Sequence, residues 1–198
     1  MKANGFVGII LILTIFSGGT ILAQETDKAT FGAGCFWGVE KVFSTVPGVV
    51  STQVGYIGGT LKNPTYEQVC TGRTGHAEAI EITFDSARLT YEKLVETFFR
   101  HHDPTTLDRQ GNDVGTQYRS AIFYHSPEQK EIAERAIRLL TESKVFDHPV
   151  VTTLEPAAAF YRAEDYHQKY LQKNPHGYCH ILFQSDKVAQ ALKLLRHK

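Results

Sequence analysis

One cysteine, set between two glycines, has the surroundings of a reactive thiol. Cys35 lies in the segment Gly34-Cys35-Phe36-Trp37-Gly38, where a predicted strand gives way to a predicted helix. A cysteine at a helix N-terminus faces unpaired backbone N–H groups and the positive end of the helix dipole, so we expect the pKa of its thiol to be lowered. Phe36 and Trp37 add aromatic surface suited to a methyl or thioether group. A buried structural cysteine at a tight turn is the alternative, but such a position does not require two glycines and two aromatic residues around it.

The hydrophobic pattern predicts alternating strands and helices around this segment. Thr90 and Ser126 have the residue types of helix N-caps, and Ser126 is followed by Pro127 and by a capping-box partner, Gln129. Strands are predicted over 28–33, 49–57, 77–84 and 120–124, and helices over 36–46, 91–99 and 127–140. A further strand over 150–154, a loop-rich stretch over 156–174 and an amphipathic helix over 187–195 complete the chain.

The order of these elements predicts the fold class. A β-α-β-β-α-β order followed by another helix is typical of an α+β protein, a two-layer sandwich with a ferredoxin-like split βαβ core, a mixed sheet and a loop-rich C-terminal segment. The chain has 198 residues, which suits one domain better than two. The counts of basic and acidic residues are equal, 21 each, so no net field favours nucleic acid or an anionic membrane surface.

The N-terminal residues have the pattern of a secretory signal. Lys2 is the only charged residue before Glu25, and residues 6–16 form an uncharged apolar run that ends at Ser17. Ala23 then provides a small residue at a predicted cleavage site. We therefore expect residues 1–23 to be a signal peptide, residues 24–198 to be a single domain, and the mature protein to be secreted or periplasmic. An uncleaved membrane anchor facing outside the cytoplasm is the alternative, although the apolar run is short for a membrane span.

The segment around Cys35 resembles the signature of a known family, the A-type peptide methionine sulfoxide reductases, which act on the S epimer of the sulfoxide. The resemblance extends from about Thr30 to Cys179. Further segments resemble family motifs in the same order: Val54-Gly55-Tyr56 with Gly58-Gly59, Asn63-Pro64-Thr65-Tyr66, Thr74-Gly75-His76-Ala77-Glu78, His102-Asp103-Pro104-Thr105, Gln110-Gly111-Asn112-Asp113, Gly115-Thr116-Gln117-Tyr118-Arg119-Ser120, Ala163-Glu164-Asp165-Tyr166-His167-Gln168-Lys169-Tyr170, and Asn174-Pro175 with Gly177-Tyr178-Cys179.

The resemblance implies a role for several residues. Cys35 is the nucleophile that attacks the sulfoxide sulfur, Glu78 is the acid that protonates its oxygen, and Tyr66 and Tyr118 hold that oxygen by hydrogen bonds. Asp113 positions the acid network or a water molecule. A glutamate beside an aromatic pocket is expected to have a raised pKa, as an acid near neutral pH requires. From the strand pattern alone, Glu78 reads as an exposed charge like Glu81, and only the surrounding motif favours the acid role.

The resemblance also implies how the enzyme is restored. Attack leaves Cys35 as a sulfenic acid, which Cys179 resolves as a disulfide that thioredoxin or a related dithiol donor reduces. No cysteine follows Cys179, which favours direct reduction of that disulfide over a three-cysteine relay. Cys70, the third cysteine, is interpreted as a buried structural thiol. The substrate is methionine sulfoxide, in proteins or free; we expect no cofactor, no metal, no nucleic acid and a monomer.

Three other interpretations remain open. A Cys-His thiol hydrolase would use His76 or His167 as its base and would form an acyl-enzyme. A metal-binding module would use His101, His102 and Asp103, or His176, Cys179 and His180, but these spacings are not those of a zinc site. His101 and His102 are better interpreted as residues that close a helix C-terminus. A secreted binding domain without catalytic activity would be insensitive to thiol alkylation.

Overall fold

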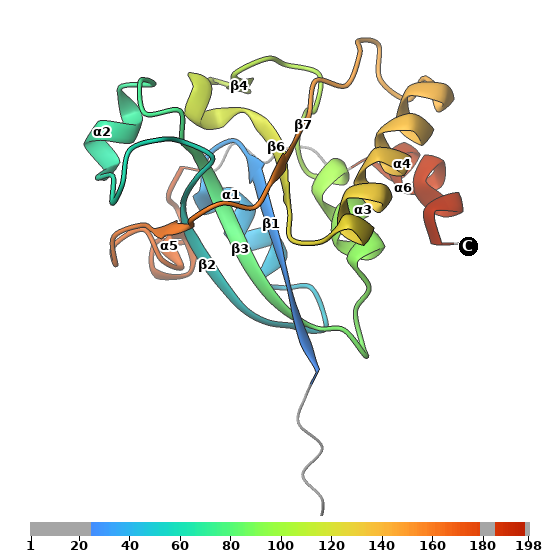
Figure 1. The fold of residues 1–198 in the computed structure, drawn as a ribbon, viewed down its shortest axis with the longest axis horizontal. Helices are drawn as coiled ribbons and strands as arrows, with labels where there is room; N and C mark the ends of the chain where they lie inside the picture. The colour runs from blue at the N-terminus through green and yellow to red at the C-terminus, as the bar shows by residue number, and fades with distance from the viewer. Residues whose placement is uncertain (1–24, 179–184, 197–198) are drawn as a thin grey trace, which may run out of the picture.

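The computed structural model describes residues 25–178 and 185–196, and its main sheet is mixed and six-stranded. Figure 1 shows this sheet with the helices beside it. Its strand order is β7-β6-β1-β3-β2-β8, and every neighbouring pair is antiparallel except β6 and β7. The central four strands have the order of the predicted ferredoxin-like core, and the α+β fold class is confirmed. The strands are β1 (Thr26–Ala33), β2 (Val49–Ile57), β3 (Ala77–Asp85), β6 (Ser120–Tyr124), β7 (Thr153–Pro156) and β8 (Tyr161–Arg162).

Helices cover one face of this sheet and enclose the main hydrophobic core. Phe31 of β1 stacks on Phe43 of α1 and on Phe98 of α3, with ring centroids 5.4 and 5.1 Å apart. Val188 and Leu192, near the C-terminus, are buried in the same core, so the last helical segment packs against α3 and α4. The helices are α1 (Phe36–Phe43), α3 (Tyr91–Arg100), α4 (Pro127–Ser143) and α6 (Asp186–Ala191), which continues as the 3-10 helix η2 (Leu192–Arg196).

The other face of the sheet has a smaller apolar cluster. Ile57, Ala79 and Phe123 are buried there, and Phe160 packs over them from the connection between β7 and β8. Short elements at one end of the sheet carry several candidate site residues: α2 (Tyr66–Cys70), the hairpin of β4 (Arg109–Gln110) and β5 (Asp113–Val114), the 3-10 helix η1 (Thr116–Tyr118) and α5 (Tyr170–Lys173).

Several predicted boundaries differ from the structure, and three of these differences have local reasons. The first helix ends at Phe43 because the hydroxyls of Ser44 and Thr45 donate hydrogen bonds to the carbonyls of its last turn. The strand predicted over 150–154 begins at Thr153, since the Val151 N–H donates to the Pro104 carbonyl and not to β6. The predicted C-terminal helix is divided at Leu192 into α6 and η2.

The capping prediction for α4 is correct in part. The Ser126 hydroxyl accepts from the Gln129 N–H, but the Gln129 side chain bonds to the His125 N–H and the Lys28 carbonyl and so links the helix to β1. In the part of the chain that the structure describes, no helix is both long and apolar enough to cross a membrane. The predicted signal segment, residues 1–23, lies outside that part.

Candidate active site

Cys35 lies at the N-cap of α1, directly after β1, as the sequence predicts. Gly34 has a φ of 83°, a left-handed conformation that glycine adopts without steric cost, and this allows the chain to turn from strand into helix. Cys35 makes no side-chain capping hydrogen bond, but the backbone N–H groups of Trp37 and Gly38 are close enough to lower the pKa of its thiol. The free N–H groups of the first helical turn thus act on the candidate nucleophile.

The predicted lowering of the Cys35 pKa is wrong for the substrate-free site. Burial raises the pKa of the thiol strongly, and the nearby Glu78 and Asp113 carboxylates raise it further, while the N–H groups of Trp37 and Gly38 lower it. The thiol is only 8% exposed, so the loss of hydration outweighs the helix terminus. Cys35 therefore rests as a thiol that carries its own proton.

Glu78 is the second candidate residue held at the N-terminus of α1. Its Oε2 accepts a hydrogen bond from the Phe36 N–H at 3.1 Å, and its side chain is buried. Burial raises the pKa of Glu78 to about 8; the Phe36 N–H lowers it and Asp113 raises it. The alternative of an exposed charge is wrong for Glu78, whereas Glu81, further along β3, forms an ion pair with Lys28. A carboxyl group that keeps its proton at neutral pH thus lies beside the thiol.

Tyr66 and Tyr118 are both half-buried near Glu78. Burial raises the pKa of each phenol, and the charge of Glu78 raises both further, so both remain hydroxyl donors at neutral pH. Tyr66 is the first residue of α2 and Tyr118 the last of η1; the Thr116 hydroxyl donates to the carbonyl of Gly72, in the turn after α2, at 3.0 Å. The structure therefore brings both predicted tyrosines to the site.

Asp113 lies on β5 and connects the site to the C-terminal segment. Its Oδ2 accepts a hydrogen bond from the Tyr178 hydroxyl at 3.2 Å, and its charge acts on Cys35 and Glu78. The β4–β5 hairpin is held because the buried Gln110 amide bonds to both the N–H and the carbonyl of Asp103. Cys179 follows Tyr178 in the chain but lies outside the described residues.

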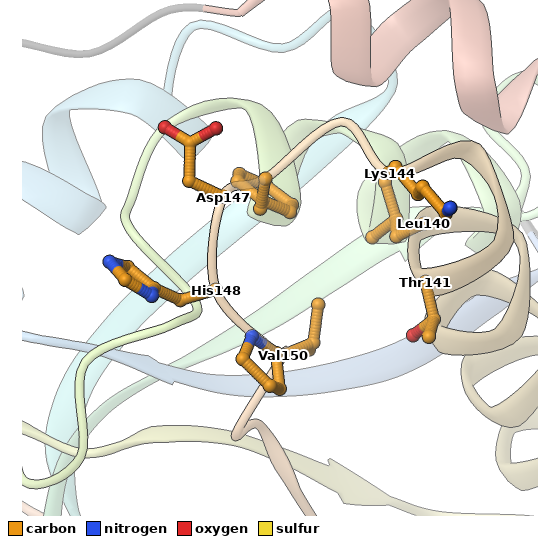
Figure 2. Close-up of a pocket in the computed structure, with 8 residues that line it drawn as sticks. Leu140, Thr141, Lys144, Asp147, His148 and Val150 are labelled. Atoms are coloured by element: carbon orange, nitrogen blue, oxygen red, sulfur yellow. The ribbon is translucent and has the colours of Figure 1, made fainter.

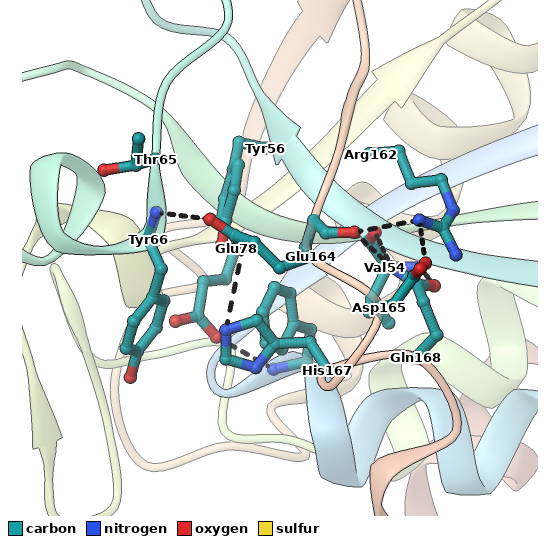
Figure 3. A network of polar contacts seen from close by, with 12 residues as sticks. Val54, Tyr56, Thr65, Tyr66, Glu78, Arg162, Glu164, Asp165, His167 and Gln168 are labelled. Atoms are coloured by element: carbon teal, nitrogen blue, oxygen red, sulfur yellow. Dashed lines mark hydrogen bonds and ion pairs between the residues drawn. The ribbon is translucent and has the colours of Figure 1, made fainter.

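An aromatic wall continues from the first turn of α1. Phe36 is buried against Tyr56, and the Trp37 indole stacks on Tyr170 with a centroid separation of 3.8 Å. His167 lies among these rings, 5.0 Å from Phe36 and 4.5 Å from Tyr66 (Figure 3). Both predicted substrate-binding residues, Phe36 and Trp37, therefore border the site.

Comparison with known proteins agrees with this geometry. The model of one protein family, peptide methionine sulfoxide reductase, matches residues 27–197. The chain belongs to this family. Its members reduce methionine sulfoxide, and the chain is thus an oxidoreductase. Among individual relatives, the peptide methionine sulfoxide reductase MsrA of Methanothermobacter thermautotrophicus is 60% identical over 156 residues, which cover 79% of this chain and 92% of that protein.

Solved structures of the family have the same fold. Methionine sulfoxide reductase A of Corynebacterium diphtheriae is 44% identical, with a TM-score of 0.69 over 78% of this chain and 77% of that chain. Reduced Mxr1 from Saccharomyces cerevisiae is 36% identical, with a TM-score of 0.74 over 81% and 93%. Mxr1 has also been solved in complex with Trx2; that chain is 24% identical, with a TM-score of 0.51 over 78% and 91%.

Two residues that hydrogen-bond to side chains or backbone of the site were not predicted to do so from the sequence. Glu164 accepts hydrogen bonds from the Tyr66 N–H at 3.0 Å and from the Tyr56 hydroxyl at 2.9 Å. His167, considered only as a hydrolase base, accepts from the Trp37 indole N–H at 2.9 Å. Both belong to the family-like segment 163–170, and this membership was the only signal in the sequence that pointed to them.

The histidine interpretations do not fit the reductase site. Both ring nitrogens of His76 face the backbone: Nδ1 accepts from the Gly59 N–H and Nε2 lies 2.8 Å from the Leu61 carbonyl. Nδ1 of His101 and of His102 lies 2.8 Å from a carbonyl of the last turn of α3, so the two residues close that helix as predicted. His176 is described, whereas Cys179 and His180 lie outside the described residues.

Cys70 was predicted to be buried, and this is wrong. It is the last residue of α2 and is exposed, because the buried side chain of this short helix is Val69. Partial burial raises the pKa of the Cys70 thiol, and the nearby Tyr66 hydroxyl lowers it.

One well-formed pocket lies elsewhere on the reductase (Figure 2). It has a volume of about 250 Å³ and is formed by the end of α4 and the connection to β7, including Lys144, Asp147 and His148. None of the candidate site residues lines it. The pocket therefore does not take part in the chemistry described above.

Proposed function

We propose that this reductase acts on the S epimer of methionine sulfoxide, in proteins or free, with Cys35 as nucleophile and Glu78 as acid. One observation carries the proposal: a single helix N-terminus serves both groups, since the Phe36 N–H donates to Glu78 while the Trp37 and Gly38 N–H groups act on the Cys35 thiol and lower its pKa. Thiol and carboxylic acid are thereby fixed side by side, as oxygen transfer from a sulfoxide to a thiol requires.

In the first step the Cys35 sulfur attacks the sulfoxide sulfur and the S–O oxygen passes to Cys35. Glu78 protonates that oxygen as the S–O bond weakens and takes up the proton that the Cys35 thiol releases, so the products are methionine, Cys35 sulfenic acid and Glu78 again in its protonated form. Tyr66 and Tyr118 donate hydrogen bonds to the oxygen, Asp113 positions the acid network, and Phe36 and Trp37 receive the methyl group. The raised pKa of Glu78, about 8, supports the acid role because the proton is present at neutral pH.

The sulfenic acid is then converted back to the thiol in two steps. The Cys179 thiol displaces water from Cys35 sulfenic acid and forms a disulfide, and a dithiol donor reduces that disulfide by exchange. The contact of Tyr178, the neighbour of Cys179, with Asp113 supports this role for Cys179. The complex of Mxr1 with Trx2 supports thioredoxin as the donor.

The cellular location is a proposal that rests on the first 23 residues. Their pattern supports export, so the reductase would act outside the cytoplasm, as a monomer, with reducing equivalents supplied across the membrane. Mass spectrometry of the protein from its native source tests this. Cleavage after Ala23 is expected, and a retained N-terminus favours the anchored alternative.

A single-turnover measurement tests the chemistry. Pre-reduced protein is mixed separately with the S and R epimers of a methionine sulfoxide peptide, without reductant. We expect one methionine per chain from the S epimer only, and a loss of two hydrogens that maps to Cys35 and Cys179. No product from either epimer would contradict the proposed function, and product without that disulfide would contradict the role of Cys179.

A further inference from the structure

The indole of Trp37 is held by a buried histidine. Its N–H donates to His167 Nδ1 at 2.9 Å, and the imidazole is only 1% exposed. Because Nδ1 accepts this bond, the neutral ring carries its proton on Nε2. The rings of Phe36, Tyr66 and Tyr166 surround the imidazole, with centroids 4.1 to 5.0 Å away.

The second nitrogen of His167 faces a carboxylate. Nε2 is buried, has no hydrogen-bond partner among the described residues, and lies 3.9 Å from Glu164 Oε2 (Figure 3). Glu164 in turn accepts from the Tyr56 hydroxyl through Oε2 and from the Tyr66 N–H through Oε1. The Glu164 carboxylate thus contacts the backbone of one site residue, and through His167 it reaches the side chain of another.

We propose that Glu164 and His167 are a positioning pair, which sets the Trp37 indole and the Tyr66 backbone relative to Cys35 and so shapes the pocket for the methyl sulfoxide group. This inference rests on the proposed function, which assigns Trp37 to the methyl group and Tyr66 to the oxygen. Neither member of the pair touches the reacting atoms; each acts through the residue that it holds.

The segment that carries the pair is itself fixed to the core. The Gln168 side-chain amide bonds to both the N–H and the carbonyl of Val54 on β2, at 3.0 and 2.9 Å. The Lys169 N–H donates to the buried Glu40 of α1 at 2.6 Å. Glu164 and His167 are therefore anchored to the same helix that presents Cys35, so a shift of the pair relative to the sulfur would break these bonds.

The bond from Trp37 requires a neutral imidazole, because a protonated ring has no acceptor. Burial lowers the pKa of His167, while the charges of Glu164 and of Glu67 on α2 raise it. The net shift is downward, so the acceptor is present at neutral pH. The remaining neighbours of the ring are the aromatic residues named above.

Two substitutions of His167 distinguish the effect of the hydrogen-bond acceptor Nδ1 from the effect of the rest of the imidazole ring. In His167→Asn the amide oxygen is as many bonds from Cα as Nδ1 and can accept from Trp37, whereas His167→Gln places its amide where Nε2 lies. Trp37 is the only tryptophan of the chain, so its indole N–H gives one resonance in a ¹H–¹⁵N spectrum of ¹⁵N-labelled protein. The full chain, reduced, is measured in each case, and thermal unfolding confirms that each variant is folded.

We expect His167→Gln to move the indole proton upfield and to lower kcat/KM for a methionine-S-sulfoxide peptide about tenfold, the effect of one buried hydrogen bond. His167→Asn should keep the indole resonance near its wild-type position and retain kcat/KM within about threefold. An unmoved indole resonance in His167→Gln overturns the proposal. The proposal is also overturned if only His167→Gln moves the resonance but both variants lose kcat/KM equally. In that case the hydrogen bond to Trp37 would have no effect on positioning.

Glu164→Gln provides a second test on a side chain that is partly exposed, 34%, and is therefore expected to fold. It should lower kcat/KM about threefold. Asp165→Asn is the matched control, since this neighbouring carboxylate is 90% exposed and pairs only with Arg162 among the described side chains. Equal kcat/KM for Glu164→Gln and Asp165→Asn overturns the role of Glu164. If the wild-type chain reduces neither epimer, the proposed function fails instead, while the indole result still reports on the Trp37–His167 bond.

Discussion

Replacement of Glu78 by glutamine should stabilise the fold while it removes activity. The carboxyl pKa rises from 4.5 in the unfolded chain to about 8 in the folded site, mainly because of burial. Between these two values the folded state keeps a proton that the unfolded state has lost, so the free energy of unfolding falls as pH rises. Glutamine has the shape of the protonated side chain and no charge to desolvate, so this pH-dependent loss should be absent from Glu78→Gln.

The expected size follows from the two pKa values. One pKa unit corresponds to about 1.4 kcal/mol, so the difference between 4.5 and about 8 amounts to about 5 kcal/mol at or above pH 8 and about 3 kcal/mol at pH 7. Below pH 4.5 both states are protonated and the difference vanishes. Any difference in hydrogen bonding between the glutamine amide and the acid shifts the stability by an amount that is independent of pH, so the slope is the decisive quantity.

Urea unfolding of the reduced protein at several pH values between 5 and 8.5 measures this slope. Near the upper end of that range the Cys35 thiol begins to titrate in the unfolded chain and adds a second pH dependence, which wild type and Glu78→Gln share. Glu81→Gln is the matched control, because Glu81 is on the same strand and its ion pair with the half-exposed Lys28 contributes at most about 1 kcal/mol. A stability difference between wild type and Glu78→Gln that does not change with pH would refute the desolvation of Glu78.

Four further outcomes are expected. The single-turnover rate of methionine formation should fall as pH rises through about 8, where Glu78 loses its proton; a rapid-quench rate that is constant from pH 6.5 to 9 would exclude Glu78 as the acid. Tyr118→Phe removes a hydroxyl donor and should lower kcat/KM about tenfold in steady-state assays, with unchanged thermal unfolding as the check on folding. Cys70→Ser should leave the yield at one methionine per chain without reductant, and a lower yield would show that Cys70 takes part. Gly34→Ala forces a side chain into a φ of 83° and should cost about 1–2 kcal/mol in urea unfolding, while an unchanged midpoint would show that the turn tolerates a side chain.

Local patterns in the sequence were sufficient to predict the core. The β1-α1-β2-β3-α3-β6 succession has strong periodicity and clear stop signals, so its order and the place of Cys35 between β1 and α1 were predicted correctly. The strand β8 was not predicted, because it has only two residues and forms when its backbone pairs with Gly55 and Tyr56 of β2. Such pairing depends on residues more than a hundred positions away, and no local pattern contains it.

The direction of the Cys35 pKa shift also could not be predicted from local sequence. A cysteine at a helix N-terminus is expected to have a lowered pKa, and the two N–H contacts that produce this effect are present. The opposite net shift comes from burial and from Glu78, which lies 43 positions further along the chain. The direction of a pKa shift is the balance of several nearby groups, and the sequence reveals only those on the same element.

The first turn of α1 has a consequence for how the enzyme responds to damage or heat. Cys35 is set by the turn between β1 and α1, and Glu78, on the neighbouring strand β3, is held by the Phe36 N–H of the same helical turn. In the proposed cycle regeneration depends instead on Cys179, whose neighbour Tyr178 is hydrogen-bonded to Asp113. The two half-reactions thus depend on different parts of the chain. Conditions that loosen the segment around Tyr178 should stop multiple turnover first, while each molecule still reduces one sulfoxide before it becomes inactive.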